Sequence, residues 1–303
     1  MVAHAVFDTR AGTIYDDEIA RRYHFPNRYL PEAKRVVGQW VVYREPRREG
    51  GREGYVAVAH VVRIEGDPAD AGKSYAIMAD YLPFDRVVPL KSEAGFYEAT
   101  RLADLDPRRI GAAIQGRSIR DISPIEFGLI VVDGLADTLD PFNARRLGLR
   151  DADPETRALL EAEPFDKARQ IQTLLVNRRI RDAAFRRAVV DAYDGTCAVT
   201  GLRMVNGGGS AEAQAAHIVP VAEDGPDVVQ NGLALSATVH WLFDRHLISL
   251  TDDYRLLVAH NRVPAELRAL FAKQLDGIHL PRNPAFRPNL DYVRRHRQAF
   301  AGH

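Results

Sequence analysis

The stretch that decides the fold of the second half of the chain is "AEAQAAHIVPVAEDGPDVVQNGLALSATVHWLF", residues Ala211–Phe243. A short apolar run that ends at His217 is typical of a strand. "EDGPDVVQNGLAL" is typical of a loop with a turn that leads into a second short strand. The segment Ser236–His246 then has helical spacing of apolar residues behind a favourable N-cap serine, and we expect Trp241, Leu242 and Phe243 to lie in the core. The sequence therefore predicts a strand–loop–strand–helix unit.

Polar residues stand where these predicted elements meet. His217 is at the end of the first strand, where a histidine is either a satisfied core group or a residue that faces a cleft. Asn231 precedes the second strand. His240 and Asp244 are four residues apart on the predicted helix, so both side chains leave the same face one turn apart. That spacing suits joint coordination of one cation.

Hairpin, loop, short strand and helix, with histidine, asparagine and histidine in that order, resemble the HNH endonucleases of the ββα-metal class. The motifs are His217 in "AAHIVP", Asn231 in "QNGLAL" and His240 in "TVHWLFD". The flanking "RRIRDAAFRRAVVDAYDGTCAVTG" and "LPRNPAF" also resemble the nuclease domain found at the C-terminus of modification-dependent restriction enzymes. The resemblance spans roughly residues 180–300.

The resemblance implies metal-dependent hydrolysis of DNA phosphodiester bonds, and it gives each motif residue a role. His217 is expected to be the general base, with a neutral imidazole that takes a proton from water. Asn231 is expected to tie the loop after His217 to the second strand. His240 is expected to bind a divalent cation, Mg²⁺ or Mn²⁺, with Asp244 as the second ligand because a carboxylate suits a hard cation.

Two positions depart from the pattern of this class. Many members carry an acidic or histidine ligand immediately before the base, where this chain has Ala216. Metal binding is therefore expected from His240 and Asp244, with Gln214 or His246 as possible neighbours. Many relatives also hold a structural zinc with CxxC pairs, whereas Cys197 is followed by Thr200 at the second cysteine position. We expect Cys197 to be a buried apolar residue and expect no structural zinc.

The length and composition of the whole chain limit the number of domains and the class of protein. The 303 residues suffice for about two domains, and the formal net charge of zero gives no global attraction to nucleic acid. One cysteine excludes an internal disulfide framework. No apolar run is long enough for a membrane span, so we expect a cytoplasmic protein without a membrane partner.

A local basic segment, "NRRIRDAAFRR", interrupts the even distribution of charge. Its arginines are candidates for contacts with DNA phosphates. The alternative is a solvated helix face. The candidate phosphate-binding residues are Arg178, Arg179, Arg186 and Arg187.

The first half of the chain is rich in β-branched and aromatic residues. Residues 36–46, 54–66 and 74–84 each read as a strand, and together they indicate a small barrel or curled sheet. "EFGLIVVDGL" is too short for periodicity to separate a strand from a buried helix. We therefore predict an α+β chain: a β-rich PUA-like recognition domain at 1–150, a helical connector at 151–192, and an HNH endonuclease domain at 193–303.

Residues 10–100 resemble the PUA superfamily, whose barrel-like sheets hold a flipped modified base in an aromatic pocket. The resemblance implies that the partner is double-stranded DNA with 5-methylcytosine or 5-hydroxymethylcytosine, recognised by base flipping. Trp40 and Tyr43 are three positions apart, so on a regular strand they face opposite sides. The candidates for stacking are Tyr23, Phe25, Tyr29, Trp40, Tyr43, Tyr81 and Phe84, and those for reading a base edge are Asp80 and Asn27.

The sequence leaves two other functions open. The nuclease fold can bind nucleic acid without cleaving it, which the alanine at position 216 favours. Alternatively, the first domain can recruit an active nuclease to a protein or an RNA. One chain carries one nuclease site, so a homodimer is the economical prediction for cleavage of both strands.

Overall fold

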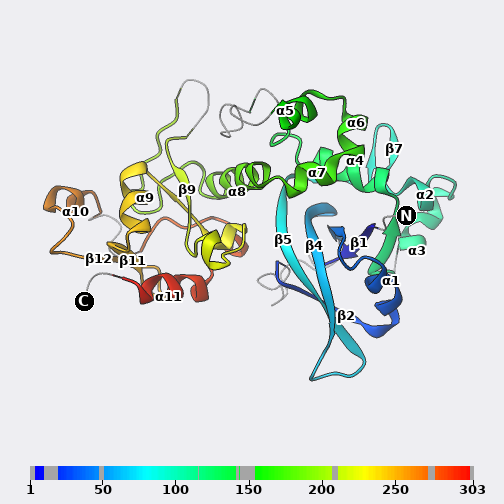
Figure 1. Ribbon diagram of the computed structural model, residues 1–303, viewed down its shortest axis with the longest axis horizontal. Coiled ribbons are helices and arrows are strands. Elements are labelled where there is room, and N and C mark those ends of the chain that lie inside the picture. Colours follow the sequence, from blue (N-terminus) through cyan, green and yellow to red (C-terminus); the bar gives the residue numbers. More distant parts are fainter. Residues whose placement is uncertain are drawn as a thin grey trace. The chain divides into compact units, whose positions relative to one another are not determined.

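The computed structural model describes residues 4–9, 20–47, 51–114, 116–140, 143, 154–206, 211–271 and 277–300. Its contacts divide the chain into two compact units, Met1–Ala184 and Phe185–His303. Helix α8 (Arg178–Ala192) runs through this boundary (Figure 1). The predicted mixture of helices and strands is confirmed. Across the described helices, none combines the length and hydropathy that crossing a bilayer requires.

A six-stranded sheet organises the first unit, in the order β2-β5-β4-β3-β1-β8. The three strands predicted from the sequence are confirmed as β3, β4 and β5. Only β1 and β3 run parallel; the other neighbours are antiparallel. The strands are β1 (His4–Asp8), β2 (Arg22–Pro26), β3 (Trp40–Glu45), β4 (Gly54–Gly66), β5 (Lys73–Val88) and β8 (Ile119–Ile122).

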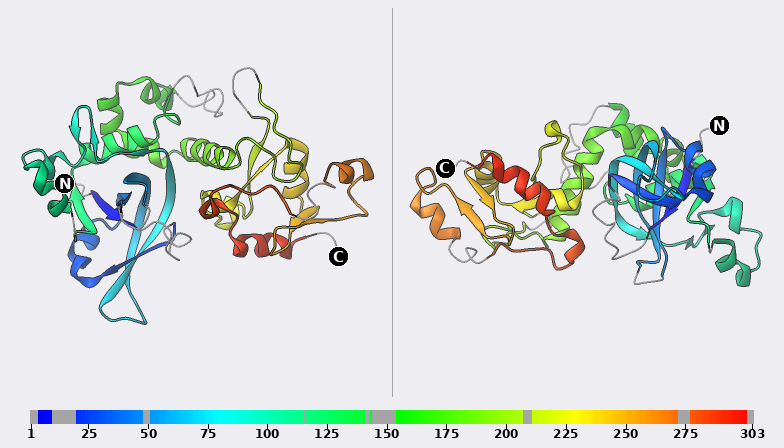
Figure 2. Two further views of the ribbon diagram at one scale, coloured as in Figure 1. Left: turned by 180° about the vertical axis from the view of Figure 1, so that it is seen from behind. Right: turned by 90° about the horizontal axis from the view of Figure 1, so that it is seen from below.

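The sheet is curled, as Figures 1 and 2 show. Register shifts interrupt the β3–β4 ladder once and the β4–β5 ladder three times. Each shift inserts unpaired backbone that bends the strand and increases its twist. The expectation of a curled sheet is thus confirmed, whereas a PUA-like barrel stays a prediction.

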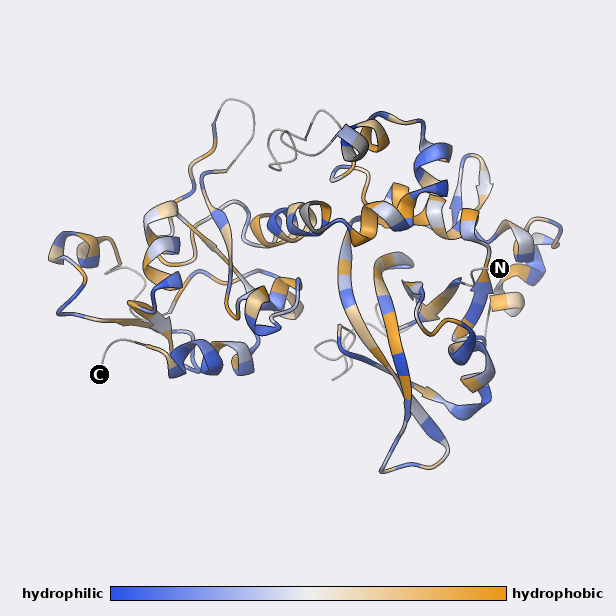
Figure 3. Cartoon of the chain, in the orientation of Figure 1, coloured by the Kyte–Doolittle hydropathy of each residue, from blue (hydrophilic) through white to orange (hydrophobic). Residues whose placement is uncertain are grey.

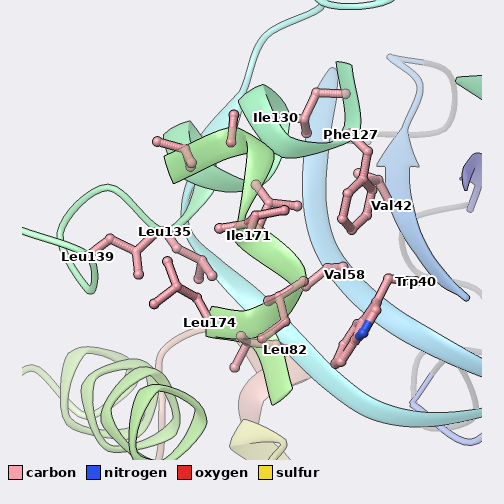
Figure 4. Packing of buried hydrophobic residues seen from close by; sticks show 14 of the residues in the cluster. Trp40, Val42, Val58, Leu82, Phe127, Ile130, Leu135, Leu139, Ile171 and Leu174 are labelled. Atoms are coloured by element: carbon pink, nitrogen blue, oxygen red, sulfur yellow. The ribbon is translucent and has the colours of Figure 1, made fainter. Parts of the chain in front are cut away.

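Helix α4 (Pro124–Gly134) settles the segment that periodicity left undecided. Ser123 and Glu126 form a reciprocal capping box, in which each side chain accepts a hydrogen bond from the other residue's backbone N–H. Pro124 occupies the first turn, where it costs no hydrogen bond. Figure 4 shows Phe127 and Ile130 of this helix packed against the sheet.

Three short helices after the predicted domain boundary also pack into the core of the first unit. They are α5 (Pro154–Glu161), α6 (Pro164–Arg169) and α7 (Ile171–Val176). A Cβ at Gly128 of α4 would lie 2.1 Å from the carbonyl oxygen of Ala168, so only glycine lets α4 and α6 approach this closely. Ile171 and Leu174 of α7 belong to the same buried cluster. The segment expected as a connector thus contributes to this core; the expected boundary at residue 150 lies outside the described residues.

The opposite face of the sheet is covered by η1 (Asn27–Tyr29) and α1 (Leu30–Arg35), over a second buried cluster rich in aromatic residues. The remaining elements of this unit are β6 (Lys91–Ser92), β7 (Gly95–Phe96), α2 (Ala99–Leu102), η3 (Pro107–Arg109) and α3 (Ile110–Ile114).

An ion-pair network is buried inside the first unit. The Arg120 guanidinium donates to both carboxylate oxygens of Glu98, at 2.7 and 2.8 Å, and to Asp8 at 2.8 Å. The Arg120 and Glu98 side chains are each 1% exposed. Burial alone would raise the pKa of Glu98, but the hydrogen bonds and charge of Arg120 outweigh it and lower that pKa. The hydroxyl of Tyr55 also donates to Glu98, at 2.9 Å.

The second unit is built on a small two-stranded sheet and the helix that follows it. These are β9 (Gln214–His217), β10 (Gly232–Leu235) and α9 (Ala237–Asp244). The other elements are η5 (Val221–Glu223), η6 (Val229–Asn231), β11 (Ile248–Leu250), β12 (Leu256–Val258), α10 (Ala265–Phe271), η8 (Pro284–Phe286) and α11 (Leu290–Gln298).

A buried histidine joins α11 to α9, although α11 is mostly hydrophilic (Figure 3). The His296 ring stacks on Phe243 with centroids 3.8 Å apart. Its Nε2 lies 3.1 Å from the carbonyl oxygen of Phe243, and its Nδ1 lies 3.0 Å from the Ser249 hydroxyl. Burial lowers the pKa of His296 to about 4, with a smaller effect from neighbouring His246.

We expect the second unit to lose stability as the pH falls from about 6.5 toward 4. The folded state holds His296 neutral, whereas the unfolded chain protonates it below its ordinary pKa of about 6.5. The stabilisation is therefore complete above that pH and decreases below it, by about 3 kcal/mol in total. Urea unfolding at pH 7 and pH 5 tests this in wild type and in His296→Gln. The variant cannot take up this proton and should lose less stability; equal losses would contradict the assignment.

Candidate active site

The predicted strand–loop–strand–helix unit is confirmed. β9 and β10 pair antiparallel, with His217 opposite Gly232. Gly232 has no room for a side chain, because a Cβ there would lie 2.3 Å from Val189 of α8. Ser236 is the N-cap of α9, but its hydroxyl accepts no capping hydrogen bond, and the amide of Ala237 in the first turn donates to the Glu212 carboxylate at 3.1 Å.

His217 is held from two sides. Its Nε2 lies 2.9 Å from Oδ1 of Asp227, and its ring stacks on Phe185 of α8 with centroids 3.8 Å apart and planes 12° apart. The side chain remains 22% exposed. With Nε2–H donated to the carboxylate, the neutral ring carries its lone pair on Nδ1. The arrangement is suited to accept a proton at Nδ1 while Asp227 stabilises the resulting imidazolium.

Asn231 is fully buried and ties together the loop that follows His217. Its Oδ1 accepts from the amide of Val219 at 2.9 Å. Its Nδ2 donates to the carbonyl oxygens of Val219, at 2.9 Å, and Pro226, at 3.0 Å. The same loop is closed at Gly225, where a Cβ would lie 1.8 Å from the carbonyl oxygen of Val219. Asn231 therefore positions the loop, and its burial keeps it from contact with substrate.

His240 and Asp244 leave one face of α9, together with Gln214 of β9. His240 Nδ1 lies 3.1 Å from Oε1 of Gln214, and its Nε2 lies 3.5 Å from Oδ2 of Asp244. His246 is not part of this group, because its ring packs against His296 at 4.6 Å. Ala216 is fully buried in the strand. Within the described ranges, no three His, Cys, Asp or Glu side chains gather as a metal site would require.

Sequence reasoning missed Asp227 and Phe185. Asp227 is one of several acids in "AEDGPD", and nothing in that pattern singles out the one that meets His217.

Trp241 was expected in the core, and this was wrong. It is 51% exposed and carries the Arg245 guanidinium 4.3 Å above its ring. The buried stripe of α9 contains Val239, Leu242 and Phe243, and Trp241 lies off that stripe.

The four candidate phosphate-binding arginines are placed differently. Arg186 is exposed on α8. Arg187 is only 13% exposed and pairs with Asp191 at 3.4 Å, so its charge is already compensated. The side chains of Arg178 and Arg179 lie outside the described residues.

Cys197, the expected apolar residue, is fully buried, with its sulfur 3.8 Å from the Ser236 hydroxyl.

Most of the candidate base-binding aromatics lie in the core of the first unit. Tyr23, Phe25 and Tyr43 are each at most 7% exposed and belong to one cluster, in which the rings of Tyr23 and Tyr43 are 6.0 Å apart. Tyr81 is half-buried at 5.9 Å from Tyr43. Trp40 belongs to the cluster on the other face of the sheet, as strand alternation predicts.

The remaining candidates of this set are also dispersed. Asp80 is exposed and forms an ion pair with Arg181. Asn27 donates to the carbonyl oxygen of Ala71 and accepts from Ser74, so it holds the β4–β5 hairpin. Phe84 packs against the core cluster around α4. The structure thus gathers Tyr23, Phe25, Tyr43 and Tyr81, and it separates them from Trp40 and Asp80.

Comparison with protein families bears on the part of the chain that holds these residues. A family model described as HNH endonuclease matches residues 197–251, a range that contains His217, Asn231 and His240. Residues 197–251 are an HNH endonuclease domain. The ββα unit described above lies within this matched range.

Two solved structures are similar to parts of this chain. The modification-dependent TagI restriction endonuclease is 26% identical, with a TM-score of 0.32, over 41% of this chain and 40% of that one. The type IV phosphorothioation-dependent restriction endonuclease ScoMcrA is 16% identical, with a TM-score of 0.19, over 88% of this chain and 48% of that one. The chain thus spans less than half the length of either. No curated protein matches it.

Replacing Asp227 with asparagine should lower the rate of DNA cleavage by the HNH domain about tenfold or more, because the amide cannot stabilise a charged imidazolium. DNA affinity should stay unchanged, because the change affects the proton transfer only. Asp224→Asn is the matched control: it alters an exposed acid of the same loop whose positive φ of 62° asparagine tolerates. Equal rates for the two variants would exclude Asp227 from the site.

Replacing Asn231 with alanine should lower cleavage about 100-fold, because the loop between His217 and Asp227 loses its anchor and small displacements are costly in catalysis. Unfolding free energy should fall by about 2–4 kcal/mol, since buried backbone groups lose their partners. The control is Asn283→Ala, which removes an exposed asparagine side chain from the same unit. Single-turnover cleavage and urea unfolding measure the two effects. A stable and fully active variant would contradict this role.

Proposed function

We propose that the chain is a metal-dependent DNA endonuclease whose HNH domain hydrolyses phosphodiester bonds and whose first unit selects DNA with modified cytosine. The observation that carries the nuclease proposal is the pairing of His217 with Asp227 on the ββα unit, beside Asn231, which holds the loop between them. A nuclease domain joined to a unit that selects modified DNA would act as a restriction enzyme that cuts only DNA with modified bases.

In this mechanism His217 is the general base. Nδ1 takes the proton of the attacking water, and the carboxylate of Asp227 stabilises the positive charge that forms on the ring. The stacked ring of Phe185 fixes the plane of the imidazole and shields one of its faces. Because the side chain is partly exposed, the proton can pass on to solvent after each turnover.

The metal would be held by His240 and Asp244, with the amide oxygen of Gln214 beside them. This donor set fits Mg²⁺ or Mn²⁺, because such ions use few protein ligands and complete their shell with water and substrate phosphate. When bound, the ion would stabilise the charge on the scissile phosphate and on the leaving oxygen. The half-exposed Asp244 carboxylate leaves room for a phosphate to approach.

Selection of modified cytosine is proposed for the curled sheet of the first unit. An extruded base costs a few kcal/mol, which stacking on aromatic rings can recover. Tyr81 is the best candidate for stacking, because it is half-buried at the edge of a cluster whose inner rings are Tyr23, Phe25 and Tyr43. Since each chain has one nuclease site, we propose a homodimer for cleavage of both strands.

Binding by the 303-residue chain with His217→Ala tests the selection step without cleavage. Duplexes of one sequence with cytosine, 5-methylcytosine or 5-hydroxymethylcytosine should bind unequally, with a modified duplex tightest. Tyr81→Ala should remove most of this difference, and Tyr75→Ala, which alters another half-buried tyrosine of β5, should leave it. Equal affinity for all three duplexes would remove the modified-base reader and leave the nuclease proposal standing.

A further inference from the structure

A cavity of about 300 Å³ in the first unit belongs to neither the aromatic cluster nor the nuclease centre. It lies among η1, α1, α2 and the start of β8. Its lining is dominated by arginine, although the chain as a whole has a formal net charge of zero. The lining residues are Arg28, Tyr29, Glu32, Arg35, Arg101, Gly116, Arg117, Ile119, Arg120 and Asp121.

Two of the five arginines are compensated by carboxylates. Arg35 contacts Asp121 at 2.6 Å, and Arg120 is held by Glu98 and Asp8 from within the core. Glu32, the second acid of the lining, lies 4.0 Å from the same Arg35 guanidinium, and its Oε2 is buried without a hydrogen-bond partner in the described part of the chain. Three further arginines stand against this one carboxylate, so the lining keeps a net positive charge.

Arg28, Arg101 and Arg117 have no carboxylate partner among the residues that the structure describes. The Arg28 guanidinium lies 4.8 Å above the ring of Tyr29, where it remains exposed. Nε of Arg101 is buried without a hydrogen-bond partner in the described part of the chain. A buried, unsatisfied donor is costly, so this N–H is available to a hydrogen-bond acceptor that enters the cavity.

We propose that this cavity binds a phosphate group of the DNA backbone. Guanidinium forks match the geometry of phosphate oxygens and remain charged at every physiological pH. A nucleobase is a poor fit, because the only aromatic ring in the lining is Tyr29, whose hydroxyl donates to the carbonyl oxygen of Gly116 and whose face carries Arg28. The inference rests on the proposed function and adds an anchoring point for DNA on the first unit.

The salt dependence of DNA binding tests this inference, measured with the full chain carrying His217→Ala. The variant Arg28→Gln/Arg101→Gln/Arg117→Gln should bind duplex DNA at least about tenfold more weakly near 0.1 M salt. Its plot of log affinity against log salt should be flatter by about two to three units, close to one for each lost contact. The control Arg47→Gln/Arg63→Gln/Arg86→Gln removes the same charge from exposed positions of the same unit. It should keep the wild-type slope.

A flatter salt dependence in the cavity variant, with the wild-type slope kept in the control, supports the proposal. If the triple variant folds poorly, the single variants Arg28→Gln and Arg117→Gln replace it, because both positions are exposed. Each should reduce the slope of log affinity against log salt by about one unit. Unchanged slopes with normal DNA binding overturn the inference and leave the proposed function intact. Thermal stabilisation by inorganic phosphate, lost in the cavity variant without any change in DNA binding, assigns the cavity to a free phosphate and overturns the DNA source. Absence of DNA binding by the parent chain overturns the proposed function itself.

Discussion

Replacing His217 with alanine is expected to lower the single-turnover rate of DNA cleavage about 10³-fold, the range that loss of a positioned general base produces. DNA affinity should change little, because the imidazole acts on water and its ring is largely packed against Phe185. Quenched-flow or gel-based cleavage with enzyme in excess measures the rate. The matched control is His260→Ala, which removes an exposed histidine of the same unit.

The fold should survive this change. Asn231 holds the loop through the backbone of Val219 and Pro226, and none of these hydrogen bonds involves His217. Circular dichroism of the alanine variant should therefore match that of wild type, and the urea midpoint should fall only modestly, because the ring contacts with Phe185 and Asp227 are lost. Cleavage by His217→Ala within about threefold of wild type would contradict the assignment of the base.

Replacing Arg120 with leucine is expected to lower the free energy of unfolding of the first unit by about 3–5 kcal/mol. The substitution leaves the buried carboxylate of Glu98 without its paired cation, and burial then opposes its charge, whereas Asp8 keeps Arg44 at 3.2 Å. Trp40 is buried in this unit, and the only other tryptophan, Trp241, is exposed in the second unit. Tryptophan emission during urea unfolding therefore follows the change.

The control for this substitution is Arg63→Leu. Arg63 pairs with Glu65 at 2.6 Å, but both side chains are about half exposed, so that pair should contribute under about 1 kcal/mol. The double variant Arg120→Leu/Glu98→Leu should recover part of the loss, because it removes the uncompensated charge together with its partner. A loss for Arg120→Leu no larger than for Arg63→Leu would show that the network does not stabilise this unit.

Sequence periodicity and turn chemistry predicted the local elements well. β3, β4, β5 and the single strands and helix of the strand–loop–strand–helix unit each have a pattern contained within one segment of at most 16 residues. The segment of α4 was ambiguous by periodicity, and the reciprocal cap between Ser123 and Glu126 accounts for its helix. Strand alternation also placed Trp40 and Tyr43 on opposite faces.

Contacts between distant residues were beyond these patterns. Asp227 meets His217 although they are ten positions apart, and Arg120 meets Asp8 although they are 112 positions apart in the sequence. Neither pair has a periodicity that a sequence can display. The same holds for Tyr23, Phe25 and Tyr43, whose residue types suit a base pocket and a core equally. Their burial followed from how the sheet curls, which depends on bulges that the sequence does not mark.

The most direct test of the central claim is cleavage of three matched plasmids by the wild-type chain, carrying cytosine, 5-methylcytosine or 5-hydroxymethylcytosine. Each is incubated with Mg²⁺, with Mn²⁺ or with EDTA, and His217→Ala is run beside wild type. Our account predicts metal-dependent cutting of a modified plasmid, no cutting with EDTA, and loss of cutting in the variant. Intact plasmids under every condition would contradict it and would assign the chain to nucleic-acid binding without cleavage, in keeping with the buried alanine at position 216.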